Sequence, residues 1–287
     1  AAEKPSLSLK VSLLAGITNV ILDFIFIVVL KWGIAGAAWA TAAGEFLGGV
    51  IPMIYFLRKN DSLLQLTKTT FNGRILLKAF TNGSSEMVTN LSLSIVGVLY
   101  NFQLMRLAGE DGVAAYGIIM YVNFIFMAIF FGYSIGTGPI VAYQYGAGNH
   151  DELKNVFRKS IKLVISTGIV LTLLAEILNV PLIKIFASYD QDMFNMTSHG
   201  FRIYAIAFLV IGVNVWGSAF FTALNNGVVS AAISFLRTLI FQVTAILLLP
   251  AVFGIDGVWF AVVAAEMLAL LVTTTFLVKN KDKYQYS

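Results

Sequence analysis

Long apolar segments with almost no charges recur along the whole chain, and they constrain its fold more than any other feature. A helix needs about 20 apolar residues to cross the hydrocarbon core of a bilayer. Only 12% of the residues are charged, against about 25% in soluble proteins, so lipid is the solvent that selects the fold. The sequence therefore predicts an all-α integral membrane protein with about eight transmembrane helices, at 11–30, 34–57, 79–105, 113–145, 163–183, 203–224, 228–249 and 258–278.

Charges in the connections predict how these helices are oriented. Lys and Arg outnumber Asp and Glu in 58–78, in 146–162 and in the tail after residue 278, and such an excess marks the cytoplasmic side. Both termini are then cytoplasmic. The basic residues are not gathered into one patch with interleaved aromatics, so the sequence offers no nucleic-acid surface. It contains no Cys and two His, which excludes disulfides and a Cys-rich or His-rich metal site.

Two of the predicted segments have further local features. As a helix, segment 113–145 is about 50 Å long, more than the roughly 30 Å core requires. We therefore expect it to tilt, bend or break near Gly132, Gly136, Gly138 and Pro139, where Pro removes a donor and Gly relaxes the backbone. We also expect a short amphipathic helix within segment 146–162.

An ionisable residue, Glu86, lies inside the apolar segment 79–105. With Asn82, Asn90 and Ser94 it recurs every four residues, which indicates one polar face on a helix. A carboxylate in a bilayer costs a few kcal/mol or more, so such residues usually mark an ion, proton or substrate path. The alternative is a Glu held by hydrogen bonds to a neighbouring helix.

Two other carboxylates lie in the first two predicted spans. Asp23 and Asn19 are four residues apart on one helical face, and could line the same interior as Glu86. Asp23 could equally cap or pair within the bundle. Glu45 lies near the middle of the second span, which begins with small residues that allow close helix packing.

An internal repeat predicts the domain organisation. GIAGAAWATAAGEFL at 33–47 aligns without a gap with GIDGVWFAVVAAEML at 254–268, an offset of 221 residues that pairs Glu45 with Glu266. A shared structural task is expected for this pair, such as bonding a backbone group or a residue like Arg237; gating or proton relay is the alternative. A tandem repeat of this period contains six spans and predicts two six-helix lobes.

The chain itself holds eight spans, so we expect it to lack four helices of the first lobe, in agreement with its start at Ala1. A family that has only eight spans would leave the repeat unexplained. The predicted domains are 1–57, the last two helices of an N-terminal lobe; 58–78, a cytoplasmic linker; and 79–287, a six-helix C-terminal lobe.

Four motifs resemble the multidrug and toxic compound extrusion (MATE) family, within a larger superfamily of flippases and exporters. They are NVILDFIF at 19–26, WGIAGAAWATAAGE at 32–45, YGAGN at 145–149 and GIDGVWFAVVAAE at 254–266. They are similar to the family's fifth and sixth, eighth, and eleventh and twelfth helices. The resemblance implies two lobes around a central cavity, alternating access, and exchange of Na⁺ or H⁺ for organic, usually cationic compounds. It also implies a multi-pass protein of the bacterial inner membrane, without a bound cofactor and monomeric when complete.

The resemblance also implies site residues. Glu86 matches the acidic residue of the family's seventh helix that binds the coupling cation or lies in the substrate cavity. Asn214 falls where the sodium-coupled branch has an Asp. The Asn lacks that carboxylate charge, which weakens a two-carboxylate sodium site and leaves Glu86 as the expected coupling residue. A Na⁺ at Glu86 is the sole metal ion expected. Substrate contacts or core packing are the alternatives for four further residues, Asn90, Ser94, Tyr121 and Asn123.

Three other functions remain as alternatives. A flippase for lipid-linked precursors would share the fold and needs a cavity rich in Arg and Lys, whereas this interior shows mainly Arg237. A membrane-embedded enzyme would need a cluster of His, Asp or Ser, which the sequence does not contain, so we expect no enzyme activity. The third alternative is an inactive truncated membrane protein.

Overall fold

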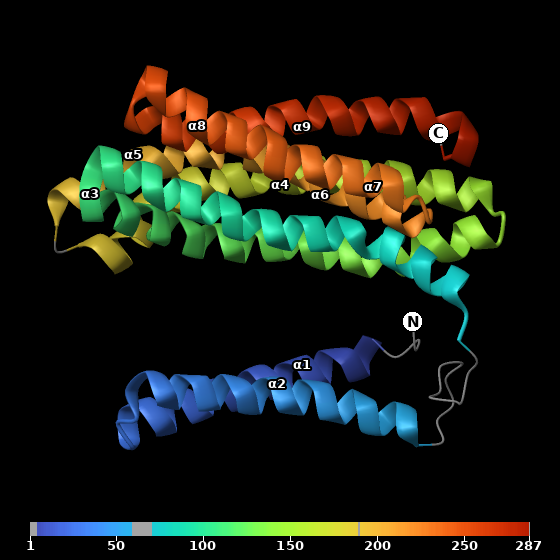
Figure 1. The fold of residues 1–287 in the computed structure, drawn as a ribbon, viewed down its shortest axis with the longest axis horizontal. Helices are drawn as coiled ribbons and strands as arrows, with labels where there is room; N and C mark the ends of the chain where they lie inside the picture. The colour runs from blue at the N-terminus through green and yellow to red at the C-terminus, as the bar shows by residue number, and fades with distance from the viewer. Residues whose placement is uncertain (1–4, 59–70, 189, 287) are drawn as a thin grey trace. The chain divides into compact units, whose positions relative to one another are not determined.

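The computed structural model describes residues 5–58, 71–188 and 190–286, apart from the side chains of residues 5, 85 and 86. The chain divides into two compact units, residues 1–72 and 73–287. All regular structure in the described residues is helical, which confirms the predicted all-α fold (Figure 1). The predicted linker 58–78 overlaps the unit boundary: residues 59–70 lie outside the described part, and residues 73–78 are already helical.

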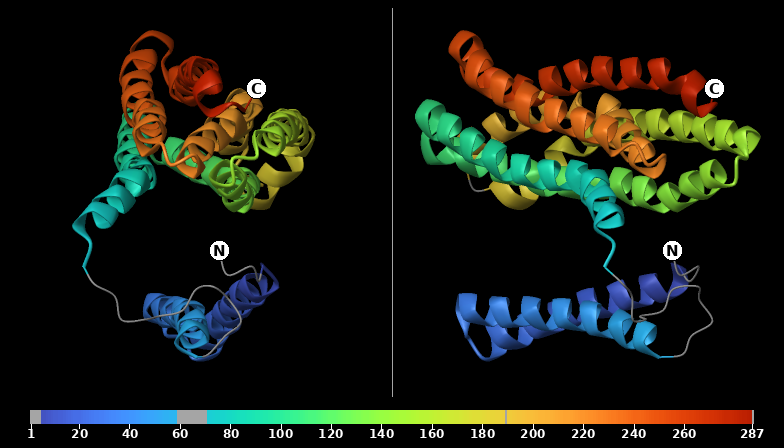
Figure 2. Two further views of the ribbon diagram at one scale, coloured as in Figure 1. Left: turned by 90° about the vertical axis from the view of Figure 1, so that its right-hand side faces the viewer. Right: turned by 45° about the vertical axis from the view of Figure 1, so that its right-hand side comes forward.

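The first unit is a helical hairpin. Helix α1 (Pro5–Asp23) continues as η1 (Phe24–Val29) and packs against α2 (Gly33–Leu57) (Figure 2). The buried residues of α2 are small and recur every four positions: Gly36, Ala40 and Gly44. A Cβ on Gly44 would lie 3.1 Å from the Ala15 carbonyl oxygen. The small residues therefore allow the close helix contact that the sequence predicts.

The second unit opens with a long helical segment, α3 (Gly73–Gly146), that folds back on itself. Gly109 has φ 65° and ψ −150° within it, a conformation open to glycine because it has no Cβ. Two limbs therefore run side by side (Figure 1), and their turn lies inside the connection that the sequence predicts at 106–112. The second limb does not break at Gly132 to Pro139, because Pro139 removes only one backbone donor. Tilting and bending remain the ways to fit its length.

Six further helices and a π-helical segment complete the second unit: α4 (His150–Ala187), α5 (Gln191–Ala205), α6 (Phe208–Ala223), α7 (Gly227–Ser234), η2 (Phe235–Phe241), α8 (Gln242–Phe253) and α9 (Ile255–Tyr284). The separate amphipathic helix predicted within 146–162 is wrong, since α4 runs unbroken from His150 into the apolar segment. Asn149 caps α4 by accepting a hydrogen bond from the Glu152 amide at 3.2 Å.

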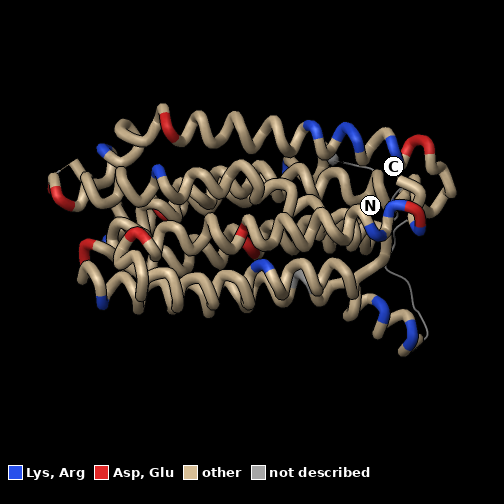
Figure 3. Tube along the Cα trace, turned by 90° about the horizontal axis from the view of Figure 1, so that it is seen from above, with Lys and Arg blue, Asp and Glu red and all other residues tan. Residues whose placement is uncertain are grey.

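Six helices in the described residues are long and apolar enough to cross a membrane, or seven if α5 and α6, which meet at a bend of 50°, form one span. Because Gly109 divides α3 into two limbs, these correspond to the eight predicted segments. Charged residues gather towards the helix ends, and few lie along the lengths between them (Figure 3).

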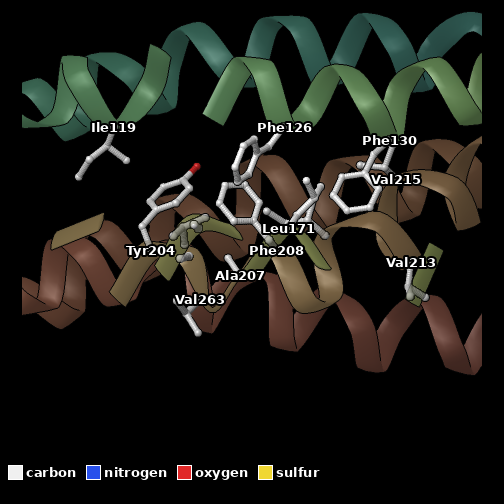
Figure 4. Packing of buried hydrophobic residues seen from close by; sticks show 14 of the residues in the cluster. Ile119, Phe126, Phe130, Leu171, Tyr204, Ala207, Phe208, Val213, Val215 and Val263 are labelled. Carbon is white, nitrogen blue, oxygen red and sulfur yellow. The ribbon is translucent and has the colours of Figure 1, made fainter. Parts of the chain in front are cut away.

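The core of the second unit is aromatic and closely packed. Phe126 and Phe208 have ring centroids 5.1 Å apart, and Figure 4 shows both rings among the buried side chains. Two glycines decide how near the helices come. A Cβ on Gly168 of α4 would lie 2.8 Å from the Phe208 carbonyl oxygen, and one on Gly212 of α6 would lie 2.3 Å from the Phe130 ring.

The internal repeat forms the same turn in both units. Gly33 and Gly254 have φ of 56° and 60°, the left-handed region that glycine tolerates. Three residues later, a Cβ on Gly36 or Gly257 would lie 2.9 Å or 2.3 Å from the preceding helix. The glycines shared by the two motifs therefore have the same two roles. The first reverses the direction of the chain, and the second allows close contact with the preceding helix.

A buried side chain compensates for a proline in α8. Pro250 lies inside this helix and has no backbone N–H to donate to the carbonyl of Ile246, four residues earlier. Gln103 of α3 donates its side-chain amide to that oxygen at 3.0 Å. The bond satisfies a carbonyl that is otherwise left without a helical partner and links α3 to α8.

Candidate functional site

The larger of the cavities described in the second unit has a volume of about 640 Å³. It lies between the two limbs of α3 and the helices α6, α7 and η2. Its wall combines apolar side chains with amides, hydroxyls and one guanidinium: Asn82, Thr89, Asn90, Leu93, Phe131, Ser134, Ile135, Gly138, Pro139, Ala142, Val215, Ser218, Ala219, Thr222, Ala223, Asn225, Ser234 and Arg237.

The polar stripe predicted on the first limb reaches this cavity only in part. Asn82 and Asn90 line it, and Asn82 Nδ2 donates to the Thr222 carbonyl at 3.4 Å. Ser94 is exposed and lines neither described cavity. The reason is helical rotation: steps of four residues drift by about 40° each, so Leu93, and not Ser94, follows Asn82 on the same face.

Glu86 lies in α3 one helical turn after Asn82. Its side chain is outside the described part of the chain, so its predicted part in cation coupling stays a prediction.

Hydroxyl groups join α6 to α7 beside the cavity. Ser218 Oγ lies 2.9 Å from Ser230 Oγ and 3.0 Å from Ser234 Oγ, and Thr222 Oγ1 lies 2.7 Å from Ser230 Oγ. Interhelical bonds between small polar residues are a common means of helix association in lipid. Sequence reasoning missed this set, although the four-residue spacing of Ser218 and Thr222, and of Ser230 and Ser234, could have revealed it.

A second cavity of about 260 Å³ lies between α3, α5, α6, η2, α8 and α9. Tyr100 and Tyr116 are stacked on its wall, with ring centroids 4.9 Å apart. Asn123, predicted as a substrate contact, lines this cavity and not the larger one. Within the described residues, Asn123 Oδ1 and the Tyr100 hydroxyl are buried without a hydrogen-bond partner.

Tyr121, also predicted as a substrate contact, lines neither described cavity. Its side chain is 64% exposed and its ring stacks on Phe186 of α4 at 6.0 Å. The physical reason is its position on the helix, because Val122 beside it is buried and each residue turns the side chain by about 100°.

A buried ionic network connects η2, α6 and α9. Arg237 Nε donates to Glu266 Oε1 at 2.8 Å and to Oε2 at 3.0 Å, which is the pair that the sequence suggested. Asn214 Nδ2 donates to Glu266 Oε2 at 2.8 Å and to the Glu266 backbone carbonyl at 2.9 Å. The exposed fractions of Arg237, Glu266 and Asn214 are 9%, 2% and 0%. Each charge is thus paired, as burial requires, and the Asn214 amide donates its hydrogen bonds to Glu266.

The first-unit carboxylates have different surroundings. Asp23 is half-buried, and its Oδ1 has no hydrogen-bond partner among the described residues. Glu45 is exposed within its unit. Within the described residues, the glutamate common to both repeats has a buried ion pair only at Glu266. No group of three or more His, Cys, Asp or Glu side chains that could hold a metal ion occurs in that part of the chain.

Comparison with known proteins identifies the family. The family model MatE matches residues 86–247, which is more than half of the chain. The chain belongs to the MatE family. This confirms the predicted resemblance, and with the apolar helices it makes the chain an integral multi-pass membrane protein.

Similar proteins and structures agree with this MatE assignment. The multidrug export protein MepA of Staphylococcus saprophyticus is 22% identical over 280 residues, covering 97% of this chain and 61% of that protein. MepA of Staphylococcus aureus is 23% identical over 268 residues, covering 92% and 58%. A crystal structure of MATE in complex with MaL6 superposes with a TM-score of 0.88 at 21% identity, over 96% of this chain and 62% of the other.

The MatE chain spans about 60% of the length of the curated relatives it matches. Another similar structure is that of a transporter of the MOP superfamily from Pyrococcus furiosus, described as having a binding pocket of reverse polarity; its TM-score is 0.87 at 20% identity, over 96% of this chain and 62% of that one. The matched relatives are exporters and not enzymes, as the sequence predicted.

Proposed function

We propose that this chain exports organic compounds by alternating access in exchange for H⁺ or Na⁺, and that most of these compounds are cationic. The observation that carries the proposal is the cavity of about 640 Å³ in the second unit. Its volume falls within the range of about 300–1,000 Å³ typical of small-molecule sites, and its mixture of apolar walls with a few polar groups suits varied amphiphilic compounds.

Glu86 is the proposed coupling residue. The support is its sequence position, one turn from the cavity residue Asn82 within an apolar limb. A single carboxylate can be neutralised by H⁺, by Na⁺ or by a cationic compound, but not by two of them at once. Competition for it therefore couples the movements, and each unit charge that moves across 100 mV contributes about 2.3 kcal/mol.

The names of the matched relatives, multidrug export proteins, support export over lipid flipping. A flippase for lipid-linked pyrophosphates needs a strongly basic cavity. Among the lining residues of the larger cavity, Arg237 is the single basic side chain, and Glu266 balances its charge. The proposal includes a bacterial inner-membrane location, cytoplasmic termini, a monomeric protein and no bound cofactor.

Efflux of a fluorescent cationic dye from cells that express this chain tests the proposal. Glu86→Gln removes the charge, and Glu176→Gln is the matched control, since Glu176 is an exposed carboxylate 3.8 Å from exposed Arg202. At equal membrane levels, efflux should persist in the control and be lost in Glu86→Gln. Equal efflux from both variants would refute coupling at Glu86, and absence of efflux from the unaltered chain would refute export by this chain.

A further inference from the structure

Arg237 uses only part of its hydrogen-bonding capacity in the buried network. Nε makes both bonds to Glu266, and within the described residues neither terminal nitrogen, Nη1 nor Nη2, has an acceptor. A guanidinium has five N–H donors in a rigid plane. Four of these donors are therefore left over on a side chain that is nine-tenths buried.

Arg237, which carries those donors, lines both cavities. Glu266 fixes the guanidinium through Nε, and Asn214 in turn holds the Glu266 carboxylate. The planar group is thus oriented in advance, which reduces the side-chain entropy that Arg237 loses when a ligand binds.

We propose that Arg237 forms a carboxylate-binding subsite, so that the cavity also accepts amphiphilic compounds with an acidic group, including zwitterions. This inference rests on the proposed function of the cavity and adds a second recognition element to it. A terminal guanidinium edge matches a carboxylate in geometry and charge. Apolar side chains such as Leu93, Phe131 and Ile135 line the same cavity and can pack against the rest of the molecule.

The ion pair itself makes the proposal specific. A bound carboxylate shares the guanidinium charge with Glu266, so removal of the Glu266 charge should strengthen its binding. A purely structural role for Arg237 and Glu266 gives no reason for such a gain. The two residues therefore affect carboxylate binding in opposite directions.

The experiment measures equilibrium dialysis of 2-naphthoate and of its neutral analogue 2-naphthamide against the full chain in detergent micelles at neutral pH. The unaltered chain should bind the carboxylate at least about tenfold more tightly, as one charge-assisted interaction provides. Arg237→Gln should abolish this preference while amide binding persists, and Glu266→Gln should increase it. The double variant Arg237→Gln/Glu266→Gln has no unpaired buried charge, and should bind both compounds equally even if a single variant does not fold.

Three results would overturn the inference. One is amide binding without any carboxylate preference in the unaltered chain, which leaves the cavity as a binding site and removes the subsite. The second is a preference that survives in the double variant. The third is absence of binding of both compounds, and dye efflux would then show whether the proposed export fails as well.

Discussion

Replacement of Gln103 by Met should destabilise the second unit, because it removes the donor that satisfies the Ile246 carbonyl. Gln103 is 8% exposed and Ile246 is fully buried. The 3.0 Å bond between the Gln103 amide and the Ile246 oxygen crosses from α3 to α8. Pro250 cannot supply a replacement, since it has no N–H.

The size of the effect follows from the carbonyl that is left behind. A buried acceptor without a partner costs about 1–3 kcal/mol, and Met fills nearly the same volume as Gln, so loss of packing adds little. If this reasoning is correct, Pro250→Ala should rescue the variant. An Ala at position 250 regains the backbone N–H that the Ile246 carbonyl accepts in a regular helix.

The measurement is a double-mutant cycle. Unfolding in mixed micelles of dodecylmaltoside and dodecyl sulfate can be followed by the fluorescence of Trp216 and Trp259, both 1% exposed in this unit. Gln103→Met should cost about 1–3 kcal/mol in the unaltered chain and clearly less, by about 1 kcal/mol or more, in the Pro250→Ala background. Equal costs in both backgrounds would refute the assignment of Gln103 as the partner of an orphaned carbonyl.

Two further predictions use the same unfolding assay. Gly257→Ala should lower the free energy of unfolding by about 1–3 kcal/mol, because its Cβ would lie 2.3 Å from the Leu249 oxygen. Gly132→Ala, whose Cβ would have no atom within 4 Å, should stabilise the helix. Similar effects at both positions would contradict this reasoning. Tyr286→Phe should cost about 1 kcal/mol by removal of the 2.6 Å bond to the Leu277 carbonyl. Burial raises the pKa of the Tyr286 hydroxyl. The stability that this hydroxyl contributes is therefore present below about pH 10 and is lost above it, as the unfolded chain ionises. If Tyr286→Phe lowered the free energy of unfolding equally at high pH, this reasoning would be wrong.

The helices and their number could be predicted because lipid offers the backbone no hydrogen-bond partners, so its polar groups must bond to one another within the helix. An apolar segment in a bilayer must satisfy its own N–H and C=O groups, so each run of about 20 apolar residues becomes a helix. The turn at Gly109 and the repeated turns at Gly33 and Gly254 follow from glycines between such runs. The Arg237–Glu266 pair was also within reach, because a buried charge in a span needs an opposite one.

The side of each helix that faces a cavity could not be predicted in the same way. In a membrane bundle the lipid-facing and core-facing sides are both apolar, so the sequence gives little sign of helix rotation. Ser94 and Tyr121 fit a plausible polar pattern yet line neither described cavity, whereas the hydroxyls of Ser218 and Thr222 line the larger one. The glycine contacts between helices contribute to these rotations, and they join residues far apart in sequence.

The sequence by itself thus determined the all-helical membrane fold, the repeat and the family, because these depend on local composition and spacing. Only the tertiary structure decided that Asn214 donates a hydrogen bond to Glu266, 52 residues away, and that Arg237 lines two cavities. Such contacts depend on which helices pack together and at what rotation. Both are set by the shapes of many side chains at once, and no single segment encodes them.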